Sequence, residues 1–416
     1  MLFNSGGAIF SCPGTFRLFS EDAGDVMKIT GFRTLRTAQH WGRPVGDVNG
    51  FISDGITEVP IVIVETDGGL EGIGVGSHAD IDRVFPALEG QDPRATFALY
   101  DRMLAHVFKS GHSGATFGGI GTLDMALWDL KAKMAGEPLW RTLGARDRYV
   151  SGYASALEIA VDDDALAALY AGWVDRGFTS VKVKGGLDFE RDVARLTIIR
   201  EIFRANSARP AIMFDANESW SRKQAIRYIS GLEEKFDLTW VEEPLRRWDA
   251  EGLAMVGRSV RAAIATGENL TGLEQFKPLL DASAVDVVQP GSIWGVTHFL
   301  RVATVAHSRD LPVSPVGYNT NPVAHAAASV PNHLSIEIQS LGSPVGITVD
   351  QTIADGGLVL GDEPGNGLSV DEDMIAGSGA RLAWSDPAGP HVRPHRAGLR
   401  LVPEESAMHS DGSVLS

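Results

Sequence analysis

Three acidic residues close three successive hydrophobic runs of the chain. Asp215 ends the run AIMFD, Glu242 ends LTWVE, and Glu268 follows AAIATG; Lys184 ends an earlier run, SVKVK. Intervals of 31, 27 and 26 residues separate these four positions, and each interval has room for one strand, one helix and two loops. The spacing therefore predicts successive β/α units of a closed parallel barrel, in which the C-terminal ends of neighbouring strands meet at one mouth.

The alternation of strands and helices is predicted to begin near Tyr149 and to end near Ile336. A length of 416 residues suits a barrel of about 250 residues plus a smaller unit. We therefore expect an α/β fold, a modified (β/α) barrel of the TIM type, with an α+β capping domain formed by the N-terminal and C-terminal segments. The predicted parts are a disordered extension at 1–26, the N-terminal capping domain at 27–146, the barrel at 147–344, a C-terminal segment at 345–385 that completes the cap, and a disordered tail at 386–416.

Two local patterns support an α+β cap. The turn Asp67-Gly68-Gly69 joins two short apolar runs and predicts a β-hairpin. Residues 119–143 have apolar side chains at helical spacing, and Gly136 and Pro138 are typical helix stops.

The overall charge excludes several classes of partner. With 37 Lys and Arg against 53 Asp and Glu, the net charge is −16 and no basic run occurs, so neither nucleic acid nor an anionic membrane is expected to bind. No apolar stretch reaches the roughly 18 residues of a spanning helix, and the first 26 residues do not resemble a signal peptide. The single cysteine, Cys12, cannot form an internal disulfide, which fits a cytoplasmic protein that acts on small molecules.

The three acids are suited to a metal site. Asp215, Glu242 and Glu268 offer the carboxylate oxygens that Mg²⁺ prefers, with coordination positions left for water and a substrate carboxylate. Each acid alone is equally consistent with a residue that caps a helix. Their recurrence at consecutive strand ends favours the metal.

Lys182 and Lys184 lie two residues apart, so their side chains share one face of a strand. On an exposed edge strand they would be ordinary solvated lysines. Inside a barrel, each ammonium should depress the pKa of the other, and Lys184, nearer the strand end, would become a general base. A base beside a divalent cation is suited to removing the proton α to a carboxylate, because positive charge stabilises the enediolate that forms.

Four motifs together resemble the mandelate racemase and muconate lactonizing branch of the enolase superfamily: K-V-K at 182–184, D-A-N at 215–217, W-V-E-E-P at 240–244 and G-E-N at 267–269. The resemblance implies Mg²⁺ as cofactor, an enediolate intermediate and a homo-oligomer. It also implies a set of roles: Asp215, Glu242 and Glu268 as metal ligands, Lys184 as base, Lys182 as its electrostatic partner, Asn217 as a donor near the bound carboxylate, and Glu337 as an acid that bonds the enediolate.

The sequence departs from the family pattern at the second acid or base. Racemase relatives carry an Asp after the sixth barrel strand and a His after the seventh, where this chain has Gly291 and Val316 or Gly317. Lactonizing relatives carry a Lys after the sixth strand, and no Lys follows Lys277. Tyr318 and His40 are predicted to line the substrate site, and the residues that could supply the missing acid are Tyr318, His298, His40 and His112.

One clear base favours an elimination in which the face that loses the proton also loses the β-hydroxyl. The sequence therefore predicts a lyase, a Mg²⁺-dependent dehydratase that converts a sugar acid (an aldonate or aldarate) to a 2-keto-3-deoxy acid. A cycloisomerase, racemase or epimerase acting on a carboxylate or lactone is the alternative reaction. A binding protein that keeps the metal but is catalytically silent is the alternative of another class, against which the intact Lys184 argues.

Overall fold

The computed structural model describes residues 26–317, 322–339 and 342–377. Parallel strands form the central sheet, and the first of them also pairs with the last, so that the sheet closes on itself. Single parallel bridges through Val313 and Val316 fill the place between the sixth strand and the last. The strands are β6 (Tyr149–Ala154), β7 (Ser180–Lys184), β8 (Ala211–Asp215), β9 (Leu238–Glu242), β10 (Ala263–Thr266), β11 (Val287–Val288) and β12 (Ile336–Ile338). The predicted barrel is confirmed.

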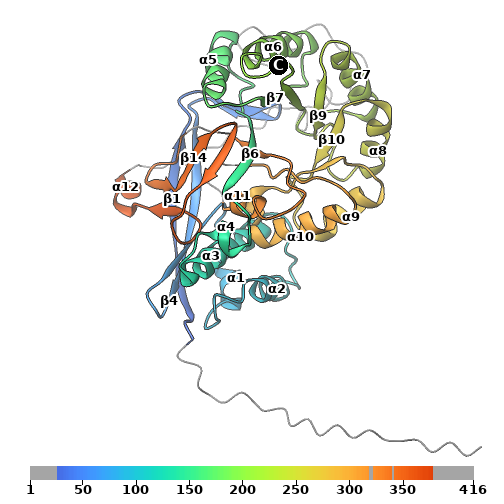
Figure 1. Ribbon diagram of the computed structural model, residues 1–416. Coiled ribbons are helices and arrows are strands. Elements are labelled where there is room, and N and C mark those ends of the chain that lie inside the picture. Colours follow the sequence, from blue (N-terminus) through green and yellow to red (C-terminus); the bar gives the residue numbers. More distant parts are fainter. Residues whose placement is uncertain (1–25, 318–321, 340–341, 378–416) are drawn as a thin grey trace, which may run out of the picture.

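Helices surround this barrel (Figure 1). Several begin at an aspartate whose side chain accepts a hydrogen bond from a backbone N–H of the first turn: Asp162 before α5, Asp188 before α6 and Asp249 before α8. Their apolar faces pack on the strands, as Ile199 of α6 does in the core. These helices are α5 (Asp163–Val174), α6 (Phe189–Phe203), α7 (Arg222–Glu233), α8 (Ala250–Ser259), α9 (Leu273–Asp281), α10 (Val296–His307) and α11 (Val323–Ala327), with a 3₁₀ turn at Ser292–Trp294.

The N-terminal part is an antiparallel sheet with helices on one side. β1, β4 and β5 pair in that order, and the predicted turn at Asp67-Gly68-Gly69 joins β4 to β5. Between β1 and β4 the chain makes a small hairpin of its own, β2 and β3. The elements are β1 (Ile29–His40), β2 (Val45–Asp47), β3 (Gly50–Ile52), β4 (Ile56–Thr66), β5 (Glu71–Val75), α1 (Ile81–Val84), a 3₁₀ turn at Phe85–Ala87, α2 (Thr96–His106), α3 (Ala115–Ala135) and α4 (Leu139–Thr142).

Helix α3 joins the two parts and is buried along most of its length. A Cβ at Gly74 of β5 would lie 2.0 Å from the carbonyl oxygen of Thr122, so glycine there allows the sheet to approach the helix closely. α3 ends at Gly136, whose φ of 67° is the left-handed conformation that closes helices, and α4 begins after Pro138. The helix predicted at 119–143 is therefore two helices, separated at the predicted stop.

The C-terminal segment contacts both parts of the molecule. β15 extends the barrel sheet by pairing antiparallel with β6, whereas Arg33 of β1 binds Glu372 of α12 at 2.7 Å. The elements are β13 (Ile347–Val349), β14 (Gln351–Ala354), β15 (Gly357–Leu360), β16 (Leu368–Val370) and α12 (Glu372–Gly377). Apart from Val26, the predicted extension 1–26 lies outside the described residues, as does the tail 386–416. None of the helices within the described ranges combines the length and the hydropathy that crossing a membrane requires.

His325 makes the fold sensitive to acid. Its ring is buried, Nδ1 accepts from the backbone N–H of Trp140 at 3.1 Å, and Nε2 therefore donates to the carbonyl oxygen of Asn366 at 3.1 Å. Burial lowers the pKa of His325 to about 4, against about 6.5 in an unfolded chain. The unfolded state thus binds the proton first, and we expect His325 to contribute about 3 kcal/mol of stability above pH 6.5 that is lost as the pH falls towards 4.

Urea unfolding of the wild type and of His325→Leu between pH 7.5 and 4 measures this contribution. The variant should be less stable at neutral pH, because Trp140 loses its acceptor, and its free energy of unfolding should fall less steeply with acid. Equal slopes for the two proteins would contradict this role of His325.

Candidate active site

The predicted residues meet at the C-terminal ends of the barrel strands. In the parallel ladder Lys184 lies opposite Asp215, and Asp215 lies opposite Glu242. Alternate residues of each strand point inward, so Lys182 shares the interior with Lys184, and all four side chains are buried. The structure therefore gathers two ammonium groups and two carboxylates at the end of β7, β8 and β9.

The ammonium groups lie between the carboxylates. Lys184 Nζ is 2.5 Å from Asp215 Oδ2. Lys182 Nζ is 2.5 Å from Glu242 Oε1, 2.9 Å from Glu337 Oε1 and 3.3 Å from Asp215 Oδ2. Glu337 comes from β12 and so reaches the same cluster from across the barrel.

These contacts set the protonation of the lysines. Burial alone would lower the pKa of Lys184, and the charge of Lys182 lowers it further, but the surrounding carboxylates, Asp215 first among them, together outweigh both, and the net pKa lies above its usual value. The sequence-based expectation of a depressed lysine pKa is therefore wrong for this arrangement. The repulsion from Lys182, two residues away on the same strand, follows from the sequence. The attraction of Asp215, on the neighbouring strand, depends on the fold.

The carboxylates divide into two groups by their surroundings. Burial would raise the pKa of Asp215, but Lys184 and Lys182 bring it down to about 2. Burial raises the pKa of Glu242 to about 8 and that of Glu268 to about 7, because the two lysines only partly compensate. The site thus holds more buried negative charge than its own cations neutralise.

A divalent cation fits this excess. Buried or half-buried carboxylates outnumber the ammonium groups, and their oxygens are hard donors of the type Mg²⁺ takes. Within the described residues, no three Asp, Glu, His or Cys side chains are grouped closely enough to enclose one ion, since the lysines lie between the carboxylates. The argument that Mg²⁺ fits this site is therefore the excess of negative charge and the carboxylate oxygen donors.

Glu268 lies half-buried beside a second acid. The amide nitrogen of Asn269 donates to Glu268 Oε1 at 3.2 Å and to Glu243 Oε1 at 3.0 Å. The indole N–H of Trp294 donates to the backbone oxygen of Glu268 at 2.5 Å, which fixes the loop after β10. Glu243 is buried and directly follows Glu242, a position that the sequence did not single out.

The loops after β8 and β9 contain residues with unusual backbone conformations. Asn217, Glu218 and Glu243 have φ angles of 43°, 61° and 42°, which non-glycine residues rarely adopt. The backbone N–H of Asn217 donates to Asp215 Oδ1 at 2.9 Å and so orients that carboxylate. The predicted donor Asn217 is thus at the site, where its main chain has this contact.

Gly291 and Gly317 stand where relatives carry the second acid or base, and the local structure gives each glycine a role. A Cβ at Gly291 would lie 2.4 Å from the backbone oxygen of Glu268 and 2.6 Å from the indole nitrogen of Trp294, so no side chain fits there. Gly317 has a φ of 137°, and its N–H donates to Glu337 Oε2 at 2.9 Å. Val316 is buried.

The candidate histidines do not join the cluster. His40 is exposed at the end of β1. His298 is buried against Phe117 and Phe276, and burial lowers its pKa to about 3, so it is a poor proton donor. His112 Nε2 lies 2.7 Å from Glu274 Oε1 of α9. Tyr318 lies outside the described residues.

The capping hairpin formed by β2 and β3 reaches the site, which the sequence did not predict. Asn49, at the turn between β2 and β3, donates its amide N–H to the backbone oxygen of Asn217 at 3.2 Å. Asp47, at the end of β2, is an electrostatic neighbour of Lys184 and Asp215. The turn sequence D-V-N-G was the available signal, but its contacts are with residues more than 100 positions away.

Arg43 fastens this hairpin to the barrel. Its guanidinium donates to the backbone oxygens of Ala156 at 3.0 Å and Leu157 at 3.4 Å, so it binds the loop after β6. Arg43→Met leaves these half-buried acceptors without their donor, at a cost of about 1.5–3 kcal/mol. We expect limited proteolysis within residues 42–55 to become about tenfold faster or more, with little change in Arg36→Met, whose side chain is exposed. Equal cleavage rates would contradict the fastening role.

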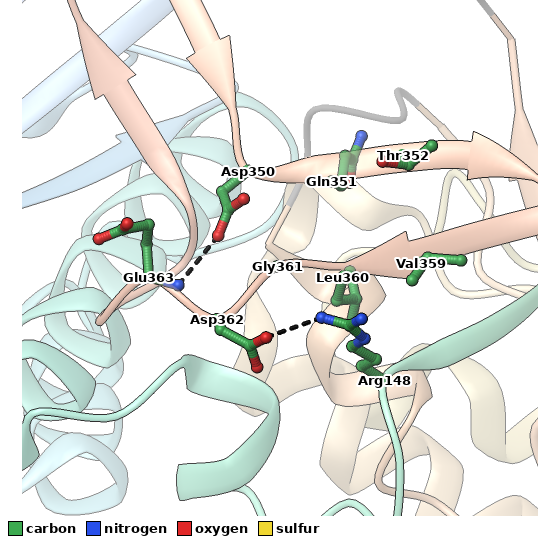
Figure 2. Close-up of a pocket in the computed structure, with 9 residues that line it drawn as sticks. All are labelled: Arg148, Asp350, Gln351, Thr352, Val359, Leu360, Gly361, Asp362 and Glu363. Carbon is green, nitrogen blue, oxygen red and sulfur yellow. Dashed lines mark hydrogen bonds and ion pairs between the residues drawn. The ribbon is translucent and has the colours of Figure 1, made fainter.

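An open pocket of about 290 Å³ lies elsewhere, along the β14–β15 hairpin (Figure 2). None of the candidate residues lines it. Two of its acidic groups have partners: Asp362 binds Arg148 at 2.7 Å and Asp350 accepts from the backbone N–H of Glu363 at 2.9 Å.

Comparison with known proteins agrees with the fold and the strand-end motifs. Residues 165–374 match the family model described as enolase C-terminal domain-like, and residues 51–144 match the mandelate racemase / muconate lactonizing enzyme N-terminal domain. The chain belongs to the mandelate racemase and muconate lactonizing enzyme branch of the enolase superfamily, as the motifs indicated.

Particular relatives are enzymes of sugar-acid chemistry. L-talarate/galactarate dehydratase of Salmonella typhimurium is 33% identical over 297 residues, which are 67% of this chain and 71% of that one. The 3,6-anhydro-alpha-L-galactonate cycloisomerase of Streptomyces coelicolor is 31% identical over 326 residues, 78% of this chain and 88% of that one. The crystal structure of a racemase from Streptomyces coelicolor A3(2) with bound magnesium superposes with a TM-score of 0.77 at 28% identity, covering 84% of this chain and 99% of that chain.

Proposed function

We propose that the protein is a Mg²⁺-dependent dehydratase of a sugar acid. The observation that carries the proposal is the buried Lys184 at a barrel-strand end, 2.5 Å from Asp215, within a cluster of carboxylates. A relative that is a sugar-acid dehydratase and a similar structure with bound magnesium support it. The substrate class is a small polyhydroxy carboxylate.

Asp215, Glu242 and Glu268 would hold the ion. When bound there, Mg²⁺ would supply positive charge beside the substrate carboxylate and Asp215, and that charge would favour the neutral amine of Lys184. Lys184 then takes the proton from the carbon α to the carboxylate. Lys182 stays charged, held by Glu242 and Glu337, and stabilises the negative charge that develops on the enediolate.

The elimination balances without an oxidant. The α C–H bond breaks and its proton goes to Lys184; the β C–O bond breaks and the hydroxyl leaves as water after gaining a proton. The resulting enol becomes the 2-keto-3-deoxy acid when its β carbon is protonated, and the ammonium of Lys184 can return that proton. Substrate therefore equals keto acid plus water.

The cycloisomerase is the second candidate, because the anhydrogalactonate enzyme aligns over 78% of this chain. Both reactions begin with the same α-proton abstraction. They differ in the product, since a cycloisomerase forms or opens a ring without losing water.

A panel of aldonates, aldarates and anhydro sugar acids tests the proposal. With Mg²⁺ we expect a 2-keto-3-deoxy acid from at least one aldonate or aldarate, and none with excess EDTA until Mg²⁺ is restored. Ring opening without loss of water would favour the cycloisomerase. A protein that binds a sugar acid but neither converts it nor exchanges its α proton would be a binding protein, and the proposal would be wrong.

A further inference from the structure

The proposed elimination needs a proton for the departing hydroxyl, and the positions that carry the second acid in relatives hold Gly291 and Val316 or Gly317. Neither glycine offers a proton, and a side chain does not fit at Gly291. Among the described residues, a proton donor therefore has to be sought on another element. The capping hairpin β2–β3 reaches the mouth from outside the barrel.

The hairpin is anchored on both sides of β7. On one side the N–H of Gly46 donates to the backbone oxygen of Leu157 at 2.9 Å, in the loop after β6. On the other side Asn49 donates to the backbone oxygen of Asn217, in the loop after β8. Because β7 lies between β6 and β8 in the sheet, the hairpin must cross the end of the strand that carries Lys184. In Figure 1 the blue segment that follows β1 lies at this end of the barrel, near α5.

Asp47 lies between the two anchors, Gly46 and Asn49. Its Oδ1 accepts from the backbone N–H of Asn49 at 2.6 Å, which fixes the carboxyl on the turn. Among charged groups, Lys184 and Asp215 act on it most strongly. Burial raises the pKa of Asp47 and Lys184 lowers it, with a net rise that favours the protonated acid. The side chain is half-buried.

We propose that Asp47 is the general acid that protonates the departing β-hydroxyl of the substrate. The inference rests on the proposed dehydration. As the β C–O bond breaks, the O–H bond of the Asp47 carboxyl breaks and its proton passes to the leaving oxygen, so that water departs. The carboxylate regains a proton from the enol as that group becomes the ketone, and the amine of Lys184 is restored when the β carbon is protonated.

A purely structural alternative is that Asp47 only stabilises the turn, by accepting the hydrogen bond from the backbone N–H of Asn49. Asp47→Asn distinguishes the two, because asparagine keeps the Oδ1 acceptor and the side-chain size but has no acidic proton. Asp54→Asn is the matched control, since Asp54 lies exposed in the same capping segment and accepts from the N–H of Ile56 at 3.2 Å.

The experiment follows two readouts in D₂O with Mg²⁺: keto-acid formation and deuterium at the α carbon of recovered substrate. Asp47→Asn should form keto acid about 10²- to 10⁴-fold more slowly, the range for loss of a general acid, while α exchange stays within a few-fold of the wild type or rises. A substrate analogue with fluoride in place of the β-hydroxyl should restore elimination in Asp47→Asn, because fluoride leaves without a proton. Asp54→Asn should behave as the wild type.

Four results would overturn the inference. Loss of less than about fivefold in keto-acid formation would show that another group is the acid. Equal loss of exchange and elimination, or no rescue by the fluoro analogue, would make Asp47 a positioning or folding residue. A wild type that exchanges the α proton of no sugar acid would refute the proposed function itself, and the role of Asp47 with it.

Discussion

Replacing Lys184 with alanine should lower kcat/KM for the acid substrate by about 10⁴-fold, the upper end of the range for a general base. Lys184 is buried and sits 2.5 Å from Asp215, at the end of the strand, where a bound substrate can present its α carbon. Lys182 remains 3.3 Å from Asp215 in this variant, so the buried carboxylate keeps a cation and the barrel should stay folded. A keto-acid assay beside thermal unfolding measures both effects.

Lys184→Arg is the matched control for charge. Arginine keeps a positive group beside Asp215 but stays protonated at any working pH, so it cannot act as a base. We expect it to be as inactive as the alanine variant. More than about a tenth of wild-type activity in Lys184→Arg would mean that Lys184 contributes only its charge.

Exchanging Glu242 for glutamine should separate metal binding from folding. Glu242 Oε1 contacts Lys182, and its Oε2 accepts from the amide of Gln289 at 2.6 Å and from the indole of Trp240 at 3.3 Å. Lys182 keeps Glu337 at 2.9 Å and Asp215 at 3.3 Å in this variant, so the buried ammonium stays paired and the metal-free barrel should remain folded. The same change removes an anionic ligand, so the Mg²⁺ affinity and the activity should each fall about 10²-fold or more.

Thermal unfolding with and without Mg²⁺ tests this separation. A ligand that binds the folded state stabilises it by RT ln(1 + [L]/Kd), so the wild type should gain stability with Mg²⁺ and Glu242→Gln should gain much less. Glu251→Gln, exposed on α8, is the control and should keep the full Mg²⁺ effect. An equal gain in Glu242→Gln would remove Glu242 from the proposed ligands.

The strand-end residues were predictable because their geometry follows from the strand itself. A parallel ladder places Lys184, Asp215 and Glu242 in register once three consecutive strands are recognised, and the pleat places Lys182 on the same face. The barrel, the β4–β5 hairpin and the stop at Gly136 follow from equally local rules. The spacing of these residues in the sequence was therefore enough to predict both the fold class and that these side chains lie close together.

Other properties depend on contacts that no local rule supplies. The elevated pKa of Lys184 arises from a carboxylate on the neighbouring strand at 2.5 Å, a distance that the sequence does not contain. The capping hairpin is placed by Gly46 on Leu157 and by Asn49 on Asn217, partners over 100 residues away. Asp47 was overlooked because nothing in the turn itself reveals which strand end it crosses.

Deuterium exchange at the α carbon decides whether Lys184 is the base, because it reports proton abstraction whether the product is a keto acid or a ring-opened acid. The protein, Mg²⁺ and a converted sugar acid are incubated in D₂O, and the recovered substrate and product are examined by NMR. If Lys184 is the base, solvent deuterium appears at the α carbon of the recovered substrate with the wild type. This exchange is abolished in both Lys184→Ala and Lys184→Arg, although each variant still binds Mg²⁺. Exchange that persists in either variant at more than about a tenth of the wild-type rate would contradict the account.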